Sequence, residues 1–195
     1  MLSLKDSLAV LRKTNALLEG HFVLSSGLHS SKYIQCAKLL SYPHLSKKIC
    51  FSLSRKIKKQ FKNIDLILSP AIGGIIIGYE IGRLLNKETI FCERVKKKFK
   101  LRRGFKIKKN TKVLIVEDVI TTGKSSLECA KIVKKSKGKI LGFACLIDRS
   151  SVNNIKIKNK KIISQVKLSV STFKKNKLPS FLKKIPIKSP GSRRL

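Results

Sequence analysis

The sequence has no tryptophan, few aromatic residues and very few acidic ones. Aromatic residues make up 6% of the 195-residue chain, so the core must be aliphatic, built mostly from Ile, Leu and Val. A chain of this length buries about 70% of the surface that its unfolded form exposes, so it needs no disulfide or metal to hold it together. We therefore expect a single domain over residues 1–195.

Paired cysteines and long apolar runs are also missing. The five cysteines are widely separated and none forms a C-x-x-C pair, which excludes a zinc ribbon and a dithiol redox motif. Most are expected to be reduced core residues, which favours a cytoplasmic location. The longest apolar stretch, at 71–79, is far shorter than the ~20 residues of a membrane-spanning helix, and no signal peptide is evident.

Lysine, by contrast, is in excess. The 45 basic and 10 acidic residues give a formal net charge of +35, which invites a nucleic-acid-binding interpretation. However, the lysines are spread along the whole chain, Lys far outnumbers Arg, and no basic patch is interleaved with aromatic residues. A solvated lysine-rich surface is therefore the favoured interpretation, and a nucleic-acid-binding protein remains the alternative.

The pattern of apolar residues predicts an α/β fold. Buried strands alternate with helices from residue 64 onward, which indicates a parallel sheet flanked by helices on both faces. The expected strands are 21–26, 30–37, 64–70, 89–93, 112–118 and 139–148, with a weaker one in 161–170; the expected helices are 4–18, 44–62, 73–85 and 122–136, and a long basic loop is expected at 94–110.

Three turns of the predicted sheet should lie at the same edge. Open parallel sheets bind their ligands beyond the carboxyl ends of the strands. The turns 69–74, 93–104 and 117–126 all follow predicted strands, so we expect the functional site to be built from them.

The segment VLIVEDVITTGKSS (113–126) carries the clearest chemistry. Its TTGKSS portion offers backbone N–H groups, hydroxyls and the positive end of a helix dipole, which together predict a phosphate-binding cradle. It is not a Walker A loop, because that motif needs a glycine where Asp118 stands. Glu117 and Asp118 would repel a bound phosphate unless a sugar, with hydroxyls that donate to the carboxylates, lay between them. The alternative is that both acids merely cap the strand. Acidic residues are scarce in this chain, which has only 10 of them, and this argues against two adjacent ones without a function.

This segment resembles the phosphoribosyl-pyrophosphate signature of the type I phosphoribosyltransferases. Most of the chain is also similar, in order and spacing, to the short bacterial form of the orotate phosphoribosyltransferase family. The signature alone indicates the superfamily, whereas the N-terminal segment and ACLIDRS point to orotate. The matching segments are GHFVLSSGLHSSKYIQCA (20–37), SPAIGGIIIGYEIG (69–82), ERVKKKFKLRRGF (93–105), ACLIDRS (144–150) and the C-terminal SPGSR (189–193).

The resemblance implies a type I phosphoribosyltransferase fold: a small N-terminal hood built mainly from 1–40, a core of about 44–150 and a C-terminal extension at 151–195. It implies transfer of ribose 5-phosphate from 5-phospho-α-D-ribose 1-diphosphate (PRPP) to orotate, which gives orotidine 5′-monophosphate and diphosphate in pyrimidine (UMP) biosynthesis. It also implies Mg²⁺, held largely by substrate oxygens and water, and a homodimer whose catalytic loop is shared across the interface. No specific nucleic-acid or membrane partner is expected.

By the same resemblance, the catalytic candidates are Lys98, Asp118 and Arg94. Arg94 and Lys98 correspond to pyrophosphate-binding positions of a mobile loop, and Glu117 and Asp118 to the pair at the ribose hydroxyls. The other interpretation of the lysines in this loop is a solvated basic surface. The PRPP-binding residues implied are Glu117, Asp118, Val119, Ile120, Thr121, Thr122, Gly123, Lys124, Ser125, Arg94 and Lys98.

Arg149 corresponds to the residue that pairs with the orotate carboxylate, where a planar guanidinium suits a planar acid. Without the signature it would be an ordinary surface arginine after a strand. The turn 69–74 resembles the family's pyrophosphate loop, where small residues let backbone amides approach the ligand, and it could equally be a tight packing turn. The orotate-binding residues implied are Thr121, Arg149, Ser25 and Tyr33.

The chain departs from long-form relatives at several positions. Those relatives carry lysine where Ser25 and Val95 stand, a Tyr-Lys pair at 72–73, and histidine where Lys100 stands. Because none of the three histidines falls in the loop, Lys98 is expected to carry most of the leaving-group stabilisation. A purine phosphoribosyltransferase, or a regulator that kept only the phosphoribosyl site, remains a rival, against which Arg149 argues because purines have no carboxylate.

Overall fold

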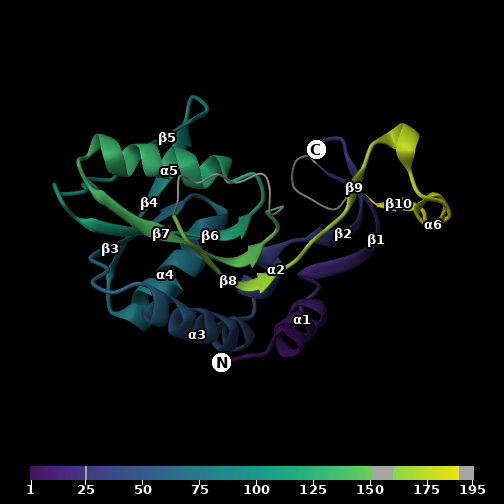
Figure 1. The fold of residues 1–195 in the computed structure, drawn as a ribbon, viewed down its shortest axis with the longest axis horizontal. Helices are drawn as coiled ribbons and strands as arrows, with labels where there is room; N and C mark the ends of the chain where they lie inside the picture. Colours follow the sequence, from purple (N-terminus) through teal and green to yellow (C-terminus); the bar gives the residue numbers. More distant parts are fainter. Residues whose placement is uncertain (25, 151–159, 189–195) are drawn as a thin grey trace.

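The structure, a computed structural model, describes residues 1–24, 26–150 and 160–188. It contains a six-stranded sheet with helices on both faces and, beside it, a four-stranded sheet (Figure 1). The predicted α/β class is confirmed. None of the helices in the described ranges is long and apolar enough to cross a membrane.

The larger sheet is parallel except at one edge. Its strands are β3 (Leu66–Pro70), β4 (Glu88–Val95), β5 (Lys98–Leu101), β6 (Lys112–Ile120), β7 (Lys139–Asp148) and β8 (Ile162–Lys167). They are ordered β5-β4-β3-β6-β7-β8, and only the β4–β5 pair is antiparallel. The carboxyl ends of β4, β3 and β6 are therefore neighbours.

Apolar residues of these strands alternate between two cores, which explains why the strands read as apolar throughout. Leu66 and Leu68 of β3 belong to the cluster under α5 (Lys124–Lys135), whereas Ile67 between them belongs to the cluster under α3 (Pro43–Gln60) and α4 (Gly73–Leu85). Figure 1 shows α5 on one face of the sheet and α3 and α4 on the other. All five cysteines are buried and free, as expected.

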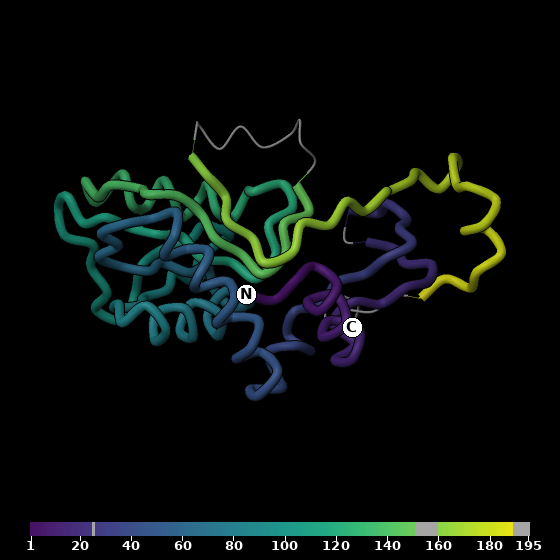
Figure 2. Tube along the Cα trace, turned by 60° about the horizontal axis from the view of Figure 1, so that its bottom comes forward, coloured from purple at the N-terminus to yellow at the C-terminus, as the bar shows by residue number. Residues whose placement is uncertain are grey.

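The smaller sheet is built from both ends of the chain. Its strands are β1 (Leu17–Val23), β2 (His29–Ile34), β9 (Thr172–Phe173) and β10 (Ile187–Lys188), in the order β10-β1-β2-β9. The C-terminal segment, yellow in Figure 2, runs along the N-terminal strands and supplies both edges of this sheet. Four short or flanking helices complete the chain: α1 (Leu4–Lys13), α2 (Cys36–Leu40), η1 (Lys175–Lys177) and α6 (Ser180–Lys183).

The expected helix over 4–18 is wrong beyond residue 13. Ser3 and Asp6 begin α1 with a capping box, as the sequence allows. The helix ends because Asn15 adopts a left-handed conformation, with φ of 54°. Leu17 and Leu18, which matched the helical spacing, instead begin β1.

The expected loop at 94–110 is also partly wrong. β4 runs on to Val95 and turns back into β5, with Val95 paired to Lys98 across a two-residue connection. Lys96 and Lys97 both have positive φ, 48° and 65°, as the two central residues of a type I′ hairpin turn must. Such turns usually carry Asn or Gly, so a turn made of two lysines gives no sequence signal for a hairpin.

Candidate active site

The three turns singled out in the sequence lie at one edge of the larger sheet, beyond the adjacent ends of β4, β3 and β6. The turn after β3 packs directly on β6: a Cβ added at Gly73 would lie 2.7 Å from the Asp118 Oδ2 atom. A Cβ added at Gly74 would likewise lie 3.2 Å from the Val116 carbonyl oxygen. A side chain at either position would crowd its neighbours, and the turn 69–74 presents bare backbone beside a carboxylate.

Glu117 and Asp118 both lie within β6, so their side chains point to opposite faces of the sheet. Glu117 is 6% exposed and accepts a short hydrogen bond from the Ser126 hydroxyl of α5. Burial raises the pKa of Glu117 to about 7, against the lowering effect of the Ser126 bond. Burial also raises the pKa of Asp118, which lies half-buried beside Gly73, while backbone N–H groups oppose this rise. The two acids therefore lie on opposite faces of β6, close to its carboxyl end.

The expected phosphate loop is shorter than the motif suggested. Val119 and Ile120 continue β6 and pair with Ile147 and Asp148 of β7, so the loop proper is 121–123. The strand expected at 112–118 is therefore two residues longer than predicted, whereas the assignment of Val119 through Ser125 to phosphate binding stays a prediction.

The loop leads into the N-terminus of α5. Gly123 caps this helix with a left-handed φ of 68° and has no side chain to occupy the N–H groups of the first turn. Thr121 and Thr122 are exposed beside them. Thr122 Oγ1 accepts only a long bond of 3.4 Å from the Lys124 N–H. These N–H groups and hydroxyls can donate hydrogen bonds to an anion that binds from solvent.

Arg149 lies immediately after β7 and next to the phosphate loop. Its backbone N–H donates to the Ile120 carbonyl at 2.8 Å, which places Arg149 beside Thr121. Its Nε atom is buried and finds no hydrogen-bond partner among the described residues. Burial lowers the pKa of Arg149. A guanidinium group held in this way favours an anionic partner.

Arg94 and Lys98 lie on the β4–β5 hairpin, on either side of its turn. Arg94 Nη1 donates to Glu128 Oε2 of α5 at 3.0 Å and to the Lys97 carbonyl at 2.8 Å. Lys98 is exposed. Within the described ranges, the structure shows no hydrogen bond or ion pair between these two cations and Glu117 or Asp118.

The smaller sheet reaches the same edge through α2. The Cys36 thiol lies 3.9 Å from the Asp118 carbonyl oxygen, and Tyr33 stands three residues before it on β2, with its ring 5.7 Å from that of Phe22. Ser25 and the C-terminal SPGSR lie outside the described residues.

Sequence analysis missed three residues of this region: Cys36, Ser126 and Glu128. Ser126 falls inside the quoted signature, and its place in the first turn of α5 gave some signal. The other two could not be recognised, because their partners lie far away in the sequence.

The comparisons with known proteins agree with this geometry. The family model of the phosphoribosyl transferase domain matches residues 39–177. The orotate phosphoribosyltransferase of Caldicellulosiruptor bescii is 45% identical over 192 residues, covering 97% of this chain and 98% of that protein. The orotate phosphoribosyltransferase structure from Aeropyrum pernix has a TM-score of 0.68 at 24% identity, covering 82% of this chain and 92% of that one.

The fold by itself does not select the base. The adenine phosphoribosyltransferase structure from Thermoanaerobacter pseudethanolicus also matches, with a TM-score of 0.61 at 18% identity over 70% of this chain and 88% of that one. The near-full-length sequence identity discriminates between the two, and by it the chain belongs to the orotate phosphoribosyltransferase family.

Proposed function

We propose that this chain transfers the 5-phosphoribosyl group of PRPP to N1 of orotate, releasing diphosphate and orotidine 5′-monophosphate in pyrimidine biosynthesis. Family membership supports the reaction class. The observation that carries the assignment of the base is the buried Nε of Arg149 beside Thr121, which has no hydrogen-bond partner among the described residues.

PRPP would lie along the sheet edge, with its three parts against three different surfaces. The 5′-phosphate accepts hydrogen bonds from the amides at 121–125, where the dipole of α5 favours negative charge. The ribose hydroxyls donate to Asp118 and Glu117, the acidic pair that stands two residues before the end of β6. The pyrophosphate approaches the backbone of the 69–74 turn, where Gly73 and Gly74 carry no side chain.

Orotate would lie between Arg149 and the smaller sheet. The orotate carboxylate satisfies the Arg149 guanidinium, which explains why a half-buried arginine has an Nε with no hydrogen-bond partner in the described part of the chain. Tyr33 and the adjoining strand would cover the ring and exclude water from the reactive sugar. A purine could not neutralise Arg149 in this position.

In the reaction the bond from C1 of the ribose to the pyrophosphate oxygen breaks, and its electron pair leaves with pyrophosphate. A bond from N1 of orotate to C1 forms, and the N1–H bond breaks, its proton leaving to water or to the departing pyrophosphate. The sugar carries positive charge in the transition state, so its neighbouring carboxylate, Asp118, stabilises it. Arg94 and Lys98 stabilise the charge that builds up on pyrophosphate.

The residues at this edge suit magnesium bound mainly by substrate. The described residues include no group of three or more His, Cys, Asp or Glu side chains that could hold a metal on its own. Asp118 and Glu117 would hold Mg²⁺ through water and the ribose hydroxyls, a mode that suits an ion reluctant to lose its waters. The ion would neutralise charge on the departing pyrophosphate.

A homodimer is part of the proposal, and α4 offers the surface for it. Ile72, which precedes the helix, is 85% exposed, and Ile76 and Tyr79, one and two turns further along the same face, are 55% and 67% exposed. A groove of about 310 Å³ between this face and α3 is flanked by Glu80 and Arg83. Because this face continues directly from the pyrophosphate turn, a second copy packed on it would bring one subunit's hairpin near the other's site.

The test is pyrophosphate release from PRPP in the presence of orotate, compared with adenine, guanine, hypoxanthine, xanthine and uracil. We expect turnover with orotate alone. Turnover with a purine and none with orotate would overturn the base assignment while leaving the fold and the PRPP site intact. Tight nucleic-acid binding that survives physiological salt would instead support the rival binding function, since weak binding is inevitable at +35.

A further inference from the structure

The Arg94 guanidinium contacts three groups of its own chain. Its two Nη atoms face the two carboxylate oxygens of Glu128, at 3.0 and 3.5 Å. Nη1 also donates to the Lys97 carbonyl at 2.8 Å, and Cζ lies 4.1 Å from the centre of the Phe99 ring. A fork-to-fork pair reinforced by a ring and a carbonyl fixes the direction of the side chain.

Glu128 belongs to the helix that follows the phosphate loop. It stands one turn after Lys124, the first residue of α5, whereas Arg94 stands one residue before the end of β4. The ion pair therefore ties the β4–β5 hairpin to the element that would hold the 5′-phosphate of PRPP.

The surrounding charges leave Glu128 as the carboxylate available to Arg94. The hairpin and the segment after it are strongly basic, and the nearby Glu93 is already paired with Arg102 and Arg103, at 3.8 and 3.3 Å. In a chain with 10 acidic residues and 45 basic ones, a carboxylate committed to a pyrophosphate-binding arginine competes directly with pyrophosphate. Both anions use the same guanidinium N–H groups.

We propose that Glu128 is a positioning residue that acts as a latch: it holds Arg94 on α5 in the free enzyme and yields it to the pyrophosphate group of the bound substrate. The inference rests on the proposed function, because that function makes Arg94 a pyrophosphate ligand. Binding of PRPP or diphosphate must break the pair, so the pair weakens the affinity for both ligands. Orotate does not use Arg94, and its binding is independent of the latch.

The test is a Glu128→Gln variant, which keeps the size and removes the charge. A partly exposed ion pair contributes about 1 kcal/mol, or about five-fold in affinity. We expect the KM for PRPP and the Kd for diphosphate, measured by calorimetry, to fall by about this factor, with the KM for orotate unchanged. Glu88→Gln, at the opposite end of β4, removes the same charge and should leave all three constants at their wild-type values.

Two further variants separate the latch from a general repulsion between Glu128 and anionic ligands. Glu128→Asp keeps the charge but shortens the reach to Arg94, so the latch predicts tighter diphosphate binding here as well. In an Arg94→Ala background, Glu128→Gln should have no further effect. An unchanged or higher Kd in both Glu128 variants, or an equal gain without Arg94, overturns the proposal.

The diphosphate measurement needs no turnover, so it is independent of the choice of base. A wild-type protein that binds diphosphate but does not use orotate would overturn the proposed function and leave the latch to be judged on its own. Circular dichroism of each variant checks that α5 is intact, which is expected because residue 128 lies on the outer part of the helix with its carboxylate partly exposed.

Discussion

At the scale of single residues, Glu117 is a carboxyl group placed where its charge is costly. It is almost fully buried beneath α5, and its pKa is raised to about 7 by burial. The Ser126 hydroxyl can donate to the ionised form, which offsets part of this cost. Asp118 is shifted in the same direction, for the same reason. With its pKa at about 7, Glu117 carries its proton in roughly half of the molecules at neutral pH, at the position where ribose hydroxyls would bind.

This shift makes stability depend on pH with a definite sign. Because the folded-state pKa of Glu117 lies above its ordinary value of 4.5, the folded state binds the proton more tightly than the unfolded state. The stabilisation is complete below pH 4.5 and is lost as the pH rises toward 7, by at most about 3 kcal/mol. Glu117→Gln should remove this slope and unfold at higher urea concentrations than wild type at pH 8.

The measurement is the free energy of urea unfolding at pH 5, 6, 7 and 8. Glu19→Gln is the control, because Glu19 is exposed in an ion pair with Arg12 and should keep the wild-type slope. Parallel pH profiles for wild type and Glu117→Gln would show that the buried carboxyl does not have the raised pKa assigned to it.

At the scale of elements, the pattern of apolar residues determined which strands and helices could be predicted from the sequence. The strands at 64–70 and 139–148 and the helix at 73–85 were predictable because both faces of the sheet are buried, so each strand is a continuous apolar run. The β4–β5 hairpin was not, because its turn places lysines at positive φ. β9 and β10 are two residues long and carry no readable pattern.

The residues of the candidate site divide in the same way, into those that a local pattern indicates and those that it does not. The strand end and helix start around 117–125 were predictable because they depend on local pattern, while phosphate binding by this loop stays a prediction. The Arg94–Glu128 pair joins residues 34 positions apart, and the Cys36 contact to Asp118 spans 82. No local pattern encodes such contacts.

The C-terminal extension should control the smaller sheet and, through it, orotate binding. Leu182 of α6 is fully buried, whereas the adjacent Phe181 is 54% exposed. Leu182→Ala should cost about 2–5 kcal/mol locally and raise the KM for orotate more than that for PRPP, because the extension supplies both edge strands of the hood.

Phe181→Ala is the matched control and should behave as wild type in both measurements. Thermal unfolding monitored by circular dichroism, together with steady-state kinetics, gives the comparison. Equal effects of Leu182→Ala on both KM values would mean that the extension supports the whole domain rather than the orotate side.

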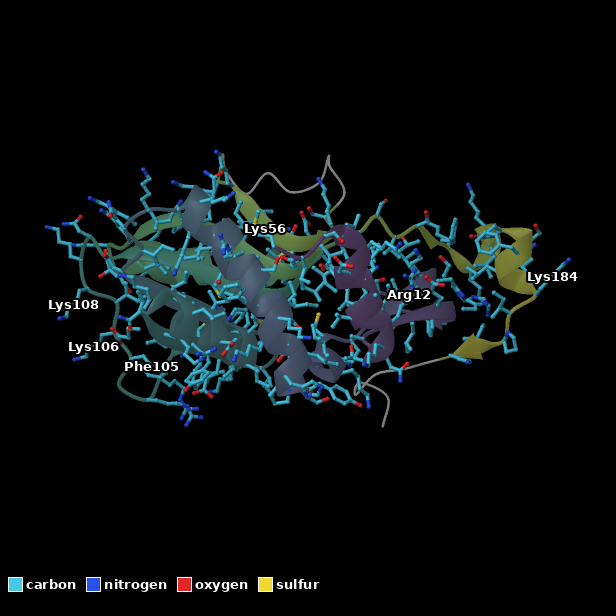
Figure 3. The ribbon with its side chains drawn as sticks, turned by 90° about the horizontal axis from the view of Figure 1, so that it is seen from below. Arg12, Lys56, Phe105, Lys106, Lys108 and Lys184 are labelled. Atoms are coloured by element: carbon cyan, nitrogen blue, oxygen red, sulfur yellow. The ribbon has the colours of Figure 1, made fainter. Side chains whose placement is uncertain are left out.

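At the scale of the whole molecule, the positive charge is dispersed. Figure 3 shows Lys106 and Lys108 at one end of the protein and Lys184 at the other. Lys56 lies between them and donates to the Ser164 and Gln165 carbonyls, at 3.2 and 3.0 Å. Every ion pair in the described part of the chain uses arginine, so the lysines act mainly as solvated surface.

The assembly is tested by mixing two inactive subunits. Lys98→Ala should lower turnover by orders of magnitude with little effect on orotate affinity, because its contact strengthens as charge leaves with pyrophosphate. Asp118→Ala disables the sugar site itself. If the hairpin of one subunit completes the site of the other, a mixed dimer contains one site with both lesions and one with neither.

An equal mixture, exchanged at random, should therefore recover about one quarter of the wild-type activity, because half the symmetric dimers are mixed and each has one intact site. Differently tagged subunits, co-expressed and purified, give the mixed dimer directly. Mixing Lys98→Ala with Arg94→Ala is the control: both lesions lie on the hairpin, so every site stays impaired and activity should not return. Recovery in the control as well would show that the mixed dimer regains activity by a route other than a shared hairpin. No recovery in either mixture would mean that each hairpin serves the site of its own chain. Each mixture contains at least one intact copy of Lys98, Asp118 and Arg94, so its activity depends only on which subunit's hairpin completes which site.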